Sequence, residues 1–152
     1  MKIKHFFILI LACSAWSACG KQGFYCDALP LAAEMMSANV RIVDKTTGAD
    51  LFLSPASPYK LSDLTVTSSV TGSNVTLLVD SSQTDKRFVR IRGDETQTYI
   101  LKLAALPADT VRMDISLTQG KCNVVGEVSA ITLNGKAACA PCSPNDIVTI
   151  SK

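Results

Sequence analysis

The most reactive side chains in this sequence are two cysteines in the segment Cys139-Ala-Pro-Cys142. The C-x-x-C spacing is typical of thiol–disulfide redox sites, which normally begin a helix whose N-terminus lowers the thiol pKa. Here Ser-Pro-Asn-Asp and a final apolar run follow instead. Redox chemistry is therefore an alternative rather than the leading interpretation. A four-cysteine zinc site is less favoured still, because it usually needs a second C-x-x-C pair.

Other groups suited to catalysis are few. The only histidine, His5, lies in a segment that we expect to be removed, which would exclude Ser–His–Asp and Cys–His catalysis and imidazole-dependent zinc sites. The pairs Asp44 with Asp50 and Asp109 with Asp114 could act as acid and base only if they faced one cleft. Their positions at turn ends or on a polar strand face predict surface charge. We therefore expect no catalytic residue, no cofactor and no metal.

Residues 1–18 have the pattern of a bacterial export signal. Two lysines precede the apolar stretch Phe6–Ala12, and small residues lead to Cys19. The apolar run is too short for a permanent membrane span, so it predicts cleavage. A small-residue pair before a cysteine resembles a lipoprotein cleavage box, in which the cysteine becomes the acylated N-terminus. We expect lipidation at Cys19. Cys13 is the alternative anchor, although it would leave a much shorter apolar region.

Removal of this segment changes the charge balance. It contains two of the fifteen basic residues and none of the thirteen acidic ones, so the mature chain would carry no net charge. A neutral domain offers no electrostatic basis for binding nucleic acid. The expected partners are a membrane, through the acyl anchor, and an envelope protein or glycan. The expected location is the cell envelope, at the periplasmic or surface face of the outer membrane.

Four cysteines remain after cleavage and lipidation: Cys26, Cys122, Cys139 and Cys142. Disulfides are the default for an even set in an oxidising compartment, and four cysteines allow three pairings that the sequence does not distinguish. We favour one bond from Cys26 to the body of the domain and one that closes the Cys122–Cys142 region. Closing a loop of about twenty residues would stabilise the fold by roughly 3 kcal/mol in the chain-entropy model.

Short apolar runs separated by turn residues predict strands rather than helices. The clearest alternation runs over 111–117, and Asn134-Gly135 between apolar runs predicts a hairpin. The spacing indicates an all-β fold, an antiparallel β-sandwich of about nine short strands, Ig-like or transthyretin-like. The expected strands are 40–44, 51–53, 64–67, 75–79, 88–92, 99–103, 111–117, 122–125, 128–133 and 147–150.

The sequence divides into three segments. Residues 1–18 are the expected lipoprotein signal, and residues 19–38 the lipidated N-terminus, a tether and a short helix or turn over 31–37. Residues 39–152 are the expected sandwich domain. Within that domain, Arg90 and Arg92 alternate with apolar neighbours, which predicts a solvated or edge-strand face.

A possible modification site lies in Asp109-Thr110-Val111, which resembles the acceptor for O-glycans on exported proteins of Bacteroidetes-type bacteria. Thr110 is therefore a glycosylation candidate, and the alternative is an ordinary strand-entry threonine. Together with 40–52, 98–103 and Asn134-Gly135 before Cys139, this motif is similar to small, functionally uncharacterised lipoproteins of Bacteroidetes-type bacteria. The resemblance would cover most of the mature chain. It implies a lipid-anchored β-sandwich and transfers no catalytic residue.

These observations favour a lipid-anchored envelope protein that acts as a non-catalytic binding or structural module. One alternative is a thiol–disulfide redox protein that uses the Cys139/Cys142 pair. The other is a sandwich that binds a glycan or a peptide. Glycan binding is the less favoured form of that alternative, because the only tryptophan, Trp16, would be removed with the signal.

Overall fold

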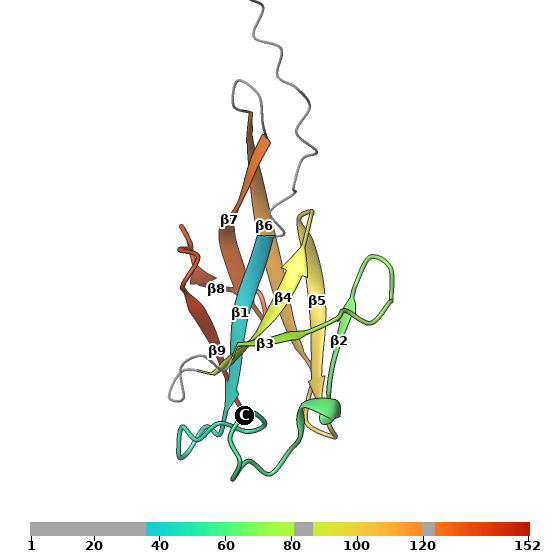
Figure 1. The fold of residues 1–152 in the computed structure, drawn as a ribbon, viewed down its shortest axis with the longest axis vertical. Helices are drawn as coiled ribbons and strands as arrows, with labels where there is room; N and C mark the ends of the chain where they lie inside the picture. The colour runs from blue at the N-terminus through green and yellow to red at the C-terminus, as the bar shows by residue number, and fades with distance from the viewer. Residues whose placement is uncertain (1–35, 81–86, 120–123) are drawn as a thin grey trace, which may run out of the picture. The chain divides into compact units, whose positions relative to one another are not determined.

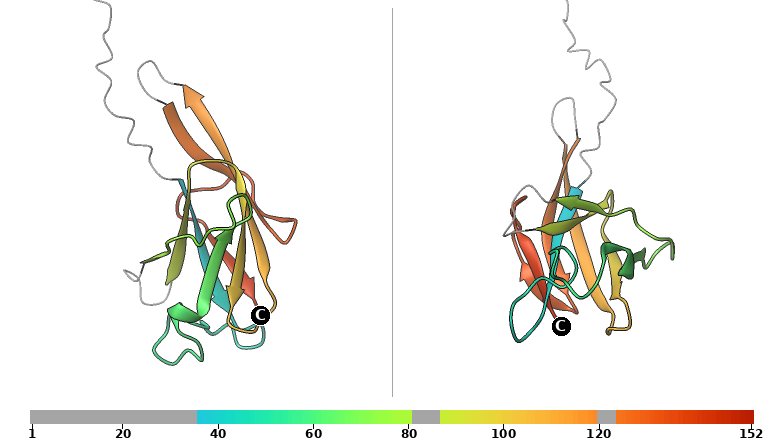
Figure 2. Two further views of the ribbon diagram at one scale, coloured as in Figure 1. Left: turned by 90° about the vertical axis from the view of Figure 1, so that its right-hand side faces the viewer. Right: turned by 60° about the horizontal axis from the view of Figure 1, so that its bottom comes forward.

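The computed structural model describes residues 36–80, 87–119 and 124–152, which form nine strands in two facing sheets (Figures 1 and 2). One sheet has the order β3-β4-β1-β9 and the other β2-β5-β6-β7-β8. The predicted all-β sandwich of about nine strands is confirmed. The elements are β1 (Met36–Val43), η1 (Leu61–Asp63), β2 (Leu64–Ser68), β3 (Leu78–Asp80), β4 (Phe88–Gly93), β5 (Gln97–Leu103), β6 (Asp109–Gln119), β7 (Val124–Leu133), β8 (Lys136–Cys139) and β9 (Ile147–Ser151).

One strand pair departs from the antiparallel pattern. β1 pairs antiparallel with β4 but parallel with β9, with Asn39 opposite Ile147. A parallel pair needs a long connection, and here the whole five-stranded sheet lies between the two strands in the sequence. The β8–β9 connection therefore passes from one sheet to the other.

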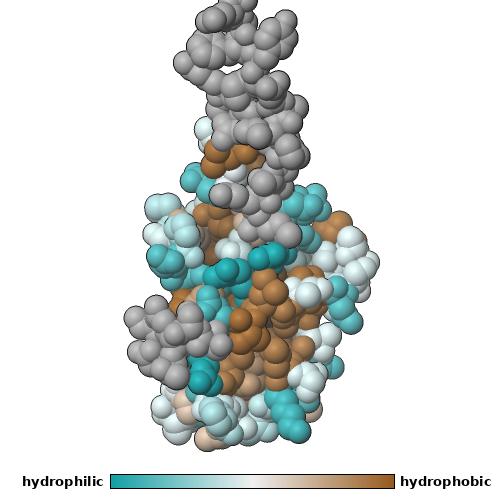
Figure 3. Space-filling view, viewed as in Figure 1, coloured by the Kyte–Doolittle hydropathy of each residue, from teal (hydrophilic) through white to brown (hydrophobic). Residues whose placement is uncertain are grey.

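Alternating residues of the strands form the core between the sheets. The largest fully buried side chain is Tyr99, whose hydroxyl donates a hydrogen bond of 3.1 Å to the carbonyl oxygen of Arg92. Burial raises the pKa of Tyr99, and the nearby acidic side chains raise it further. The other large, fully buried side chains of this core are Val40, Ile42, Val66, Val89, Ile91, Leu101, Leu103, Val111, Met113 and Ile150. Apolar side chains also reach the surface over part of the face in Figure 3.

The expected helix over 31–37 is wrong for its last two residues, which begin β1. These residues pair with the last two residues of β4, and this pairing overrides a local preference for helix. Residues 31–35 lie outside the described part of the chain. The described residues contain no helix long and apolar enough to span a membrane.

Four of the predicted strands differ clearly from the observed elements. Residues 51–53 form a bend rather than a strand, because the Asp50 carboxylate accepts the backbone N–H groups of Phe52 and Leu53 at 3.0 and 2.6 Å. The described parts of the two runs predicted over 122–125 and 128–133 belong to one strand, β7. Only the end of the run at 75–79 is in a strand, the short edge strand β3.

Candidate functional site

The candidate site is a cleft of about 230 Å³ beside the β8–β9 connection. It lies where the start of β1 meets the middle of β7, so both sheets contribute to its walls. The lining residues are Met36, Ser37, Gly126, Glu127, Val128, Ile131, Cys142, Ser143, Pro144 and Asp146.

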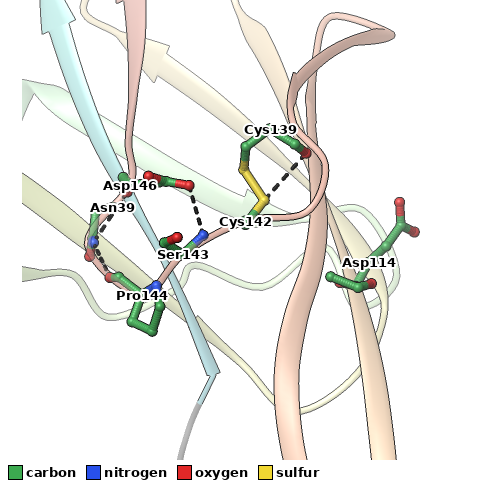
Figure 4. Close-up of a disulfide and its surroundings, with 8 residues drawn as sticks. Asn39, Asp114, Cys139, Cys142, Ser143, Pro144 and Asp146 are labelled. Atoms are coloured by element: carbon green, nitrogen blue, oxygen red, sulfur yellow. Dashed lines mark hydrogen bonds between the residues drawn. A yellow bond between two sulfur atoms is a disulfide. The ribbon is translucent and has the colours of Figure 1, made fainter.

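A disulfide joins Cys139, the last residue of β8, to Cys142 in the connection (Figure 4). The Cα atoms are 5.1 Å apart, within the range that a disulfide spans, and both cysteines are half-buried. The predicted bond closing the Cys122–Cys142 region is therefore wrong, because the sulfur of Cys142 is already bonded to its near neighbour. Cys26 and Cys122 lie outside the described residues, as do both candidate anchors, Cys13 and Cys19.

The connection is also held by Asn39, a side chain that sequence reasoning missed. Asn39 is only 3% exposed, and its side-chain amide donates to the carbonyl oxygens of Pro144 at 3.0 Å and Asp146 at 3.3 Å. Its own oxygen accepts from Nε of Arg90 at 3.3 Å. Within the connection, the Asp146 carboxylate accepts the N–H of Ser143 at 2.7 Å. These bonds fix one wall of the cleft. The sequence signal that could have indicated this role is a single amide side chain in the apolar run that forms β1.

The chemistry of the cleft combines an apolar floor with negative charge. Met36, Val128 and Ile131 supply apolar surface, and Asp146 is an exposed carboxylate among the lining residues. Glu127 also borders the cleft, but its carboxylate accepts a hydrogen bond from the Ser116 hydroxyl at 3.3 Å on the other face of β7. None of the described residues that line the cleft is a lysine or an arginine. Such a lining can bury an apolar stem and pair with a cationic group at its end.

The first predicted carboxylate pair lies at turns, as expected, but only Asp44 is a surface charge, because the Asp50 side chain is 8% exposed. Asp44 accepts the backbone N–H groups of Thr46 and Thr47 at 2.9 and 2.7 Å. The hydrogen bonds from the Thr47 backbone and hydroxyl and from the Thr46 backbone hold the pKa of Asp44 below its ordinary value. Asp50 closes the next turn and forms an ion pair of 3.4 Å with Arg41. Neither carboxylate lines the cleft.

For the second pair, Asp109 and Asp114, the prediction of surface charge is wrong for Asp109. Asp109 is buried at 8% exposure, whereas we expected surface charge. It occupies an inward position of β6, where it forms an ion pair with Lys152 and accepts a 2.9 Å hydrogen bond from the Asn134 amide. Asp114 instead pairs with Arg112 at 2.8 Å and is partly exposed. An odd number of positions separates Asp109 from Asp114 along the strand, so their side chains point to opposite faces and do not share a cleft.

The glycosylation candidate Thr110 is an exposed residue of β6 beside the Asn134-Gly135 turn. Its backbone N–H donates to the Asn134 side-chain oxygen at 2.8 Å, and its hydroxyl approaches the same oxygen at 3.4 Å. Asn134 and Gly135 both have positive φ, 51° and 77°, as the two central residues of a type I′ hairpin require. The turn joins β7 to β8, so the predicted hairpin is confirmed.

The basic residues of β4 alternate as predicted. Val89 and Ile91 are in the core, while Arg90 and Arg92 point to the other face. The edge-strand interpretation is wrong, because β4 lies between β3 and β1. Arg90 contacts Asp80 at 3.4 Å as well as Asn39, so it contributes to the fold.

No family model, curated protein or solved structure matches the chain. Among the described residues, no group of three or more histidine, cysteine, aspartate or glutamate side chains is arranged to hold a metal ion.

Proposed function

We propose that this chain is an exported cell-envelope protein, lipid-anchored at Cys19, whose sandwich binds a partner and catalyses no reaction. The observation that carries the binding role is the cleft beside the Cys139–Cys142 disulfide, with its apolar floor and the exposed carboxylate of Asp146. The export signal pattern supports an envelope location, and a disulfide is consistent with an oxidising compartment.

The chemistry of the cleft favours a cationic side chain of a protein partner. At about 230 Å³ the cleft is smaller than the pockets that enclose drug-sized ligands, so a side chain or a short peptide segment fits better than an extended glycan. The apolar floor would contact the methylene groups of a lysine or arginine. The Asp146 carboxylate would pair with its charge.

Metabolic labelling with an acyl precursor tests the anchor. We expect the wild type and Cys13→Ala to be labelled and Cys19→Ala to lose the label. Persistent labelling of Cys19→Ala, with loss in Cys13→Ala, would move the anchor to Cys13. Absence of label in the wild type would contradict the lipid anchor altogether.

Filling the cleft tests the binding role. Ser143→Tyr adds a large side chain to a lining residue but keeps the backbone N–H that bonds to Asp146. Ser69→Tyr is the matched control, an exposed serine outside the cleft lining. We expect a protein that cross-links to the wild type in intact envelopes to be lost with Ser143→Tyr and retained with Ser69→Tyr. Equal cross-linking by both variants would contradict binding at the cleft.

The disulfide also favours a second candidate, thiol–disulfide exchange. A dithiol on another envelope protein would attack the Cys139–Cys142 bond through a mixed disulfide and leave as a disulfide, while both cysteines take up protons as thiols. Cys139 ends β8 and the next described element after Cys142 is β9, so no helix begins at the pair to lower the thiol pKa. We therefore prefer a structural role. If alkylation of intact envelopes traps reduced Cys139 and Cys142, the redox candidate gains.

A further inference from the structure

Three polar side chains from distant parts of the sequence meet at one end of the sandwich. They belong to Asp109 at the start of β6, Asn134 in the β7–β8 turn and Lys152 after the end of β9. The end of β9 and the start of β6 lie at the same end of the sandwich in Figures 1 and 2. One oxygen of the Asp109 carboxylate pairs with Nζ of Lys152, and the other accepts a hydrogen bond from Nδ2 of Asn134 at 2.9 Å. A single carboxylate therefore bridges an amine and an amide nitrogen.

The amine and the carboxylate of this cluster are shielded from water and held in place. The side chains of Asp109 and Lys152 are each 10% exposed. Nζ of Lys152 also donates to the carbonyl oxygen of Pro107. The backbone N–H of Lys152 donates to the carbonyl oxygen of Val43 at 2.9 Å, and its own carbonyl oxygen accepts the N–H of Lys45 at 2.6 Å. Such fixed placement removes much of the entropic barrier to a reaction between neighbouring groups.

The side-chain amide of Asn134 is oriented and polarised by its two partners. Its oxygen accepts the backbone N–H of Thr110 at 2.8 Å, and its nitrogen donates to Asp109. A backbone N–H can only donate and a carboxylate accepts, so these partners determine which end of the amide is oxygen. A donor at the amide oxygen stabilises the negative charge that develops there when a nucleophile attacks the carbonyl carbon. The amide is therefore set up as an electrophile.

We propose that Lys152 and Asn134 form an intramolecular isopeptide bond, with Asp109 transferring the protons. Asp109 takes a proton from the Lys152 ammonium group, and the neutral Nζ attacks Cγ of Asn134. The Nζ–Cγ bond forms and the Cγ–Nδ2 bond breaks. Of the three protons on Nζ, one stays on the new amide and two pass through the Asp109 carboxylate to the leaving nitrogen, which departs as ammonium. The reaction needs no oxidant and no second molecule, and it occurs once in each chain.

The contacts favour Asn134 over Asp109 as the group that is attacked. Attack on Asp109 itself would release water and would need an acid to protonate the departing oxygen. The side-chain partners that hold Asp109 in the described chain are an amine and an amide, and neither is a carboxylic acid. The Asp109 carboxylate is instead placed to pass protons between the two nitrogens that it bridges.

The isopeptide bond would tie the two sheets together. β9 belongs to the four-stranded sheet, whereas β7 and β8 belong to the five-stranded sheet. A bond from Asn134 to Lys152 closes a loop of about eighteen residues, and it would restrict the unfolded chain as a disulfide does. A buried ion pair alone is weak evidence for added stability. The bond can form only after folding has brought the three residues together, and it does not depend on the proposed anchor or on the cleft.

Peptide mapping by mass spectrometry tests the proposal on the full chain. After reduction and alkylation, trypsin separates residues 122–136, which contain Asn134, from residues 137–152, which contain Lys152. We expect these two peptides to appear as one linked peptide, lighter than their sum by one molecule of ammonia. The linked peptide is the readout, because an asparagine before a glycine can also lose ammonia by cyclisation onto its own backbone.

Three variants each remove one member of the cluster. Lys152→Arg keeps the positive charge beside Asp109, but a guanidinium group stays protonated and is no nucleophile. Asn134→Gly removes the amide and suits the positive φ of the turn. Asp109→Ala keeps both reacting groups and removes the proton carrier. Lys136→Arg is the matched control, an exposed lysine of β8 whose replacement keeps the trypsin site. We expect the linked peptide in the wild type and in Lys136→Arg, and in none of the three variants.

Other outcomes would overturn the proposal. Separate, unmodified peptides from a folded wild-type chain would mean that the three side chains form only a hydrogen-bonded ion pair. A link from residues 137–152 to residues 103–112 with loss of water would mean that Lys152 reacts with Asp109 instead. A linked peptide that persists in Asp109→Ala would contradict the proton transfer. Circular dichroism checks that each variant folds; if Asp109→Ala does not, Asp109→Asn keeps the size of the side chain and takes its place, again with no link from Asn134 to Lys152 expected.

Discussion

Replacement of Asn39 by alanine would test how much the hydrogen bonds between β1 and the β8–β9 connection stabilise the sandwich. The substitution removes three hydrogen bonds, two to the carbonyl oxygens of Pro144 and Asp146 and one from Arg90. A hydrogen bond contributes about 1 kcal/mol net, so the three together contribute about 3 kcal/mol. Pro144 and Asp146 are exposed, so water recovers part of this loss at their carbonyl groups. We expect a net destabilisation of about 2–3 kcal/mol.

Thermal unfolding followed by circular dichroism measures this effect under non-reducing conditions. At roughly 4 °C per kcal/mol, the midpoint of Asn39→Ala should fall by about 10 °C. Asn74→Ala is the matched control, because Asn74 is exposed and a surface substitution usually changes stability by less than about 0.5 kcal/mol. If Asn39→Ala unfolds at the same temperature as Asn74→Ala, the stability of the β8–β9 connection does not depend on this amide and the reasoning is refuted.

Two further predictions concern the core and a turn. In Gly93→Ala the new Cβ would lie 2.3 Å from the hydroxyl oxygen of Tyr99, so we expect a loss of about 3 kcal/mol in urea unfolding. Adding Tyr99→Phe should recover part of it, and no recovery would contradict this cause. The hydrogen bonds to Asp44 lower its pKa below the ordinary value of 3.8, so its charged form stabilises the fold at pH values above 3.8. This contribution is lost as the pH falls through the lower pKa of the folded state. At neutral pH, Asp44→Asn should therefore unfold at a lower urea concentration than the wild type, and near pH 2 the two should unfold at similar urea concentrations. A difference between the two midpoints that does not change with pH would contradict this prediction.

Patterns that depend on near neighbours could be predicted from the sequence. The alternation over 111–117, the Asn134-Gly135 turn and the two faces of β4 each follow from a few consecutive residues. The burial of Asp109 was also within reach, because it continues the inward positions of Val111 and Met113. The turn chemistry around Asp109 favoured a surface position, and its ion pair with Lys152 comes from a distant part of the chain.

Features that depend on distant residues could not be predicted. In the sequence, Asn39 is one polar residue in an apolar run. Its role follows only from the position of the β8–β9 connection, whose carbonyl groups accept hydrogen bonds from its amide. The parallel pairing of β1 with β9 depends on the order of all the strands between them. The choice of Cys139 as the partner of Cys142 depends on how tightly the intervening residues turn, and cysteine counting alone does not contain that information.

The pairing of β1 with β9 would have a consequence for folding during the export that we propose. Asn39 bonds to a residue 107 positions later, so β1 cannot complete its sheet until nearly all of the chain is present. If the N-terminus crosses the membrane first, one edge of β1 stays open while β2 to β8 arrive. An open edge is a template for pairing with other chains, and contacts over long sequence separations form slowly. If the chain is exported in this way, the interval between the arrival of β1 and that of β9 is the time at which it is most exposed to aggregation.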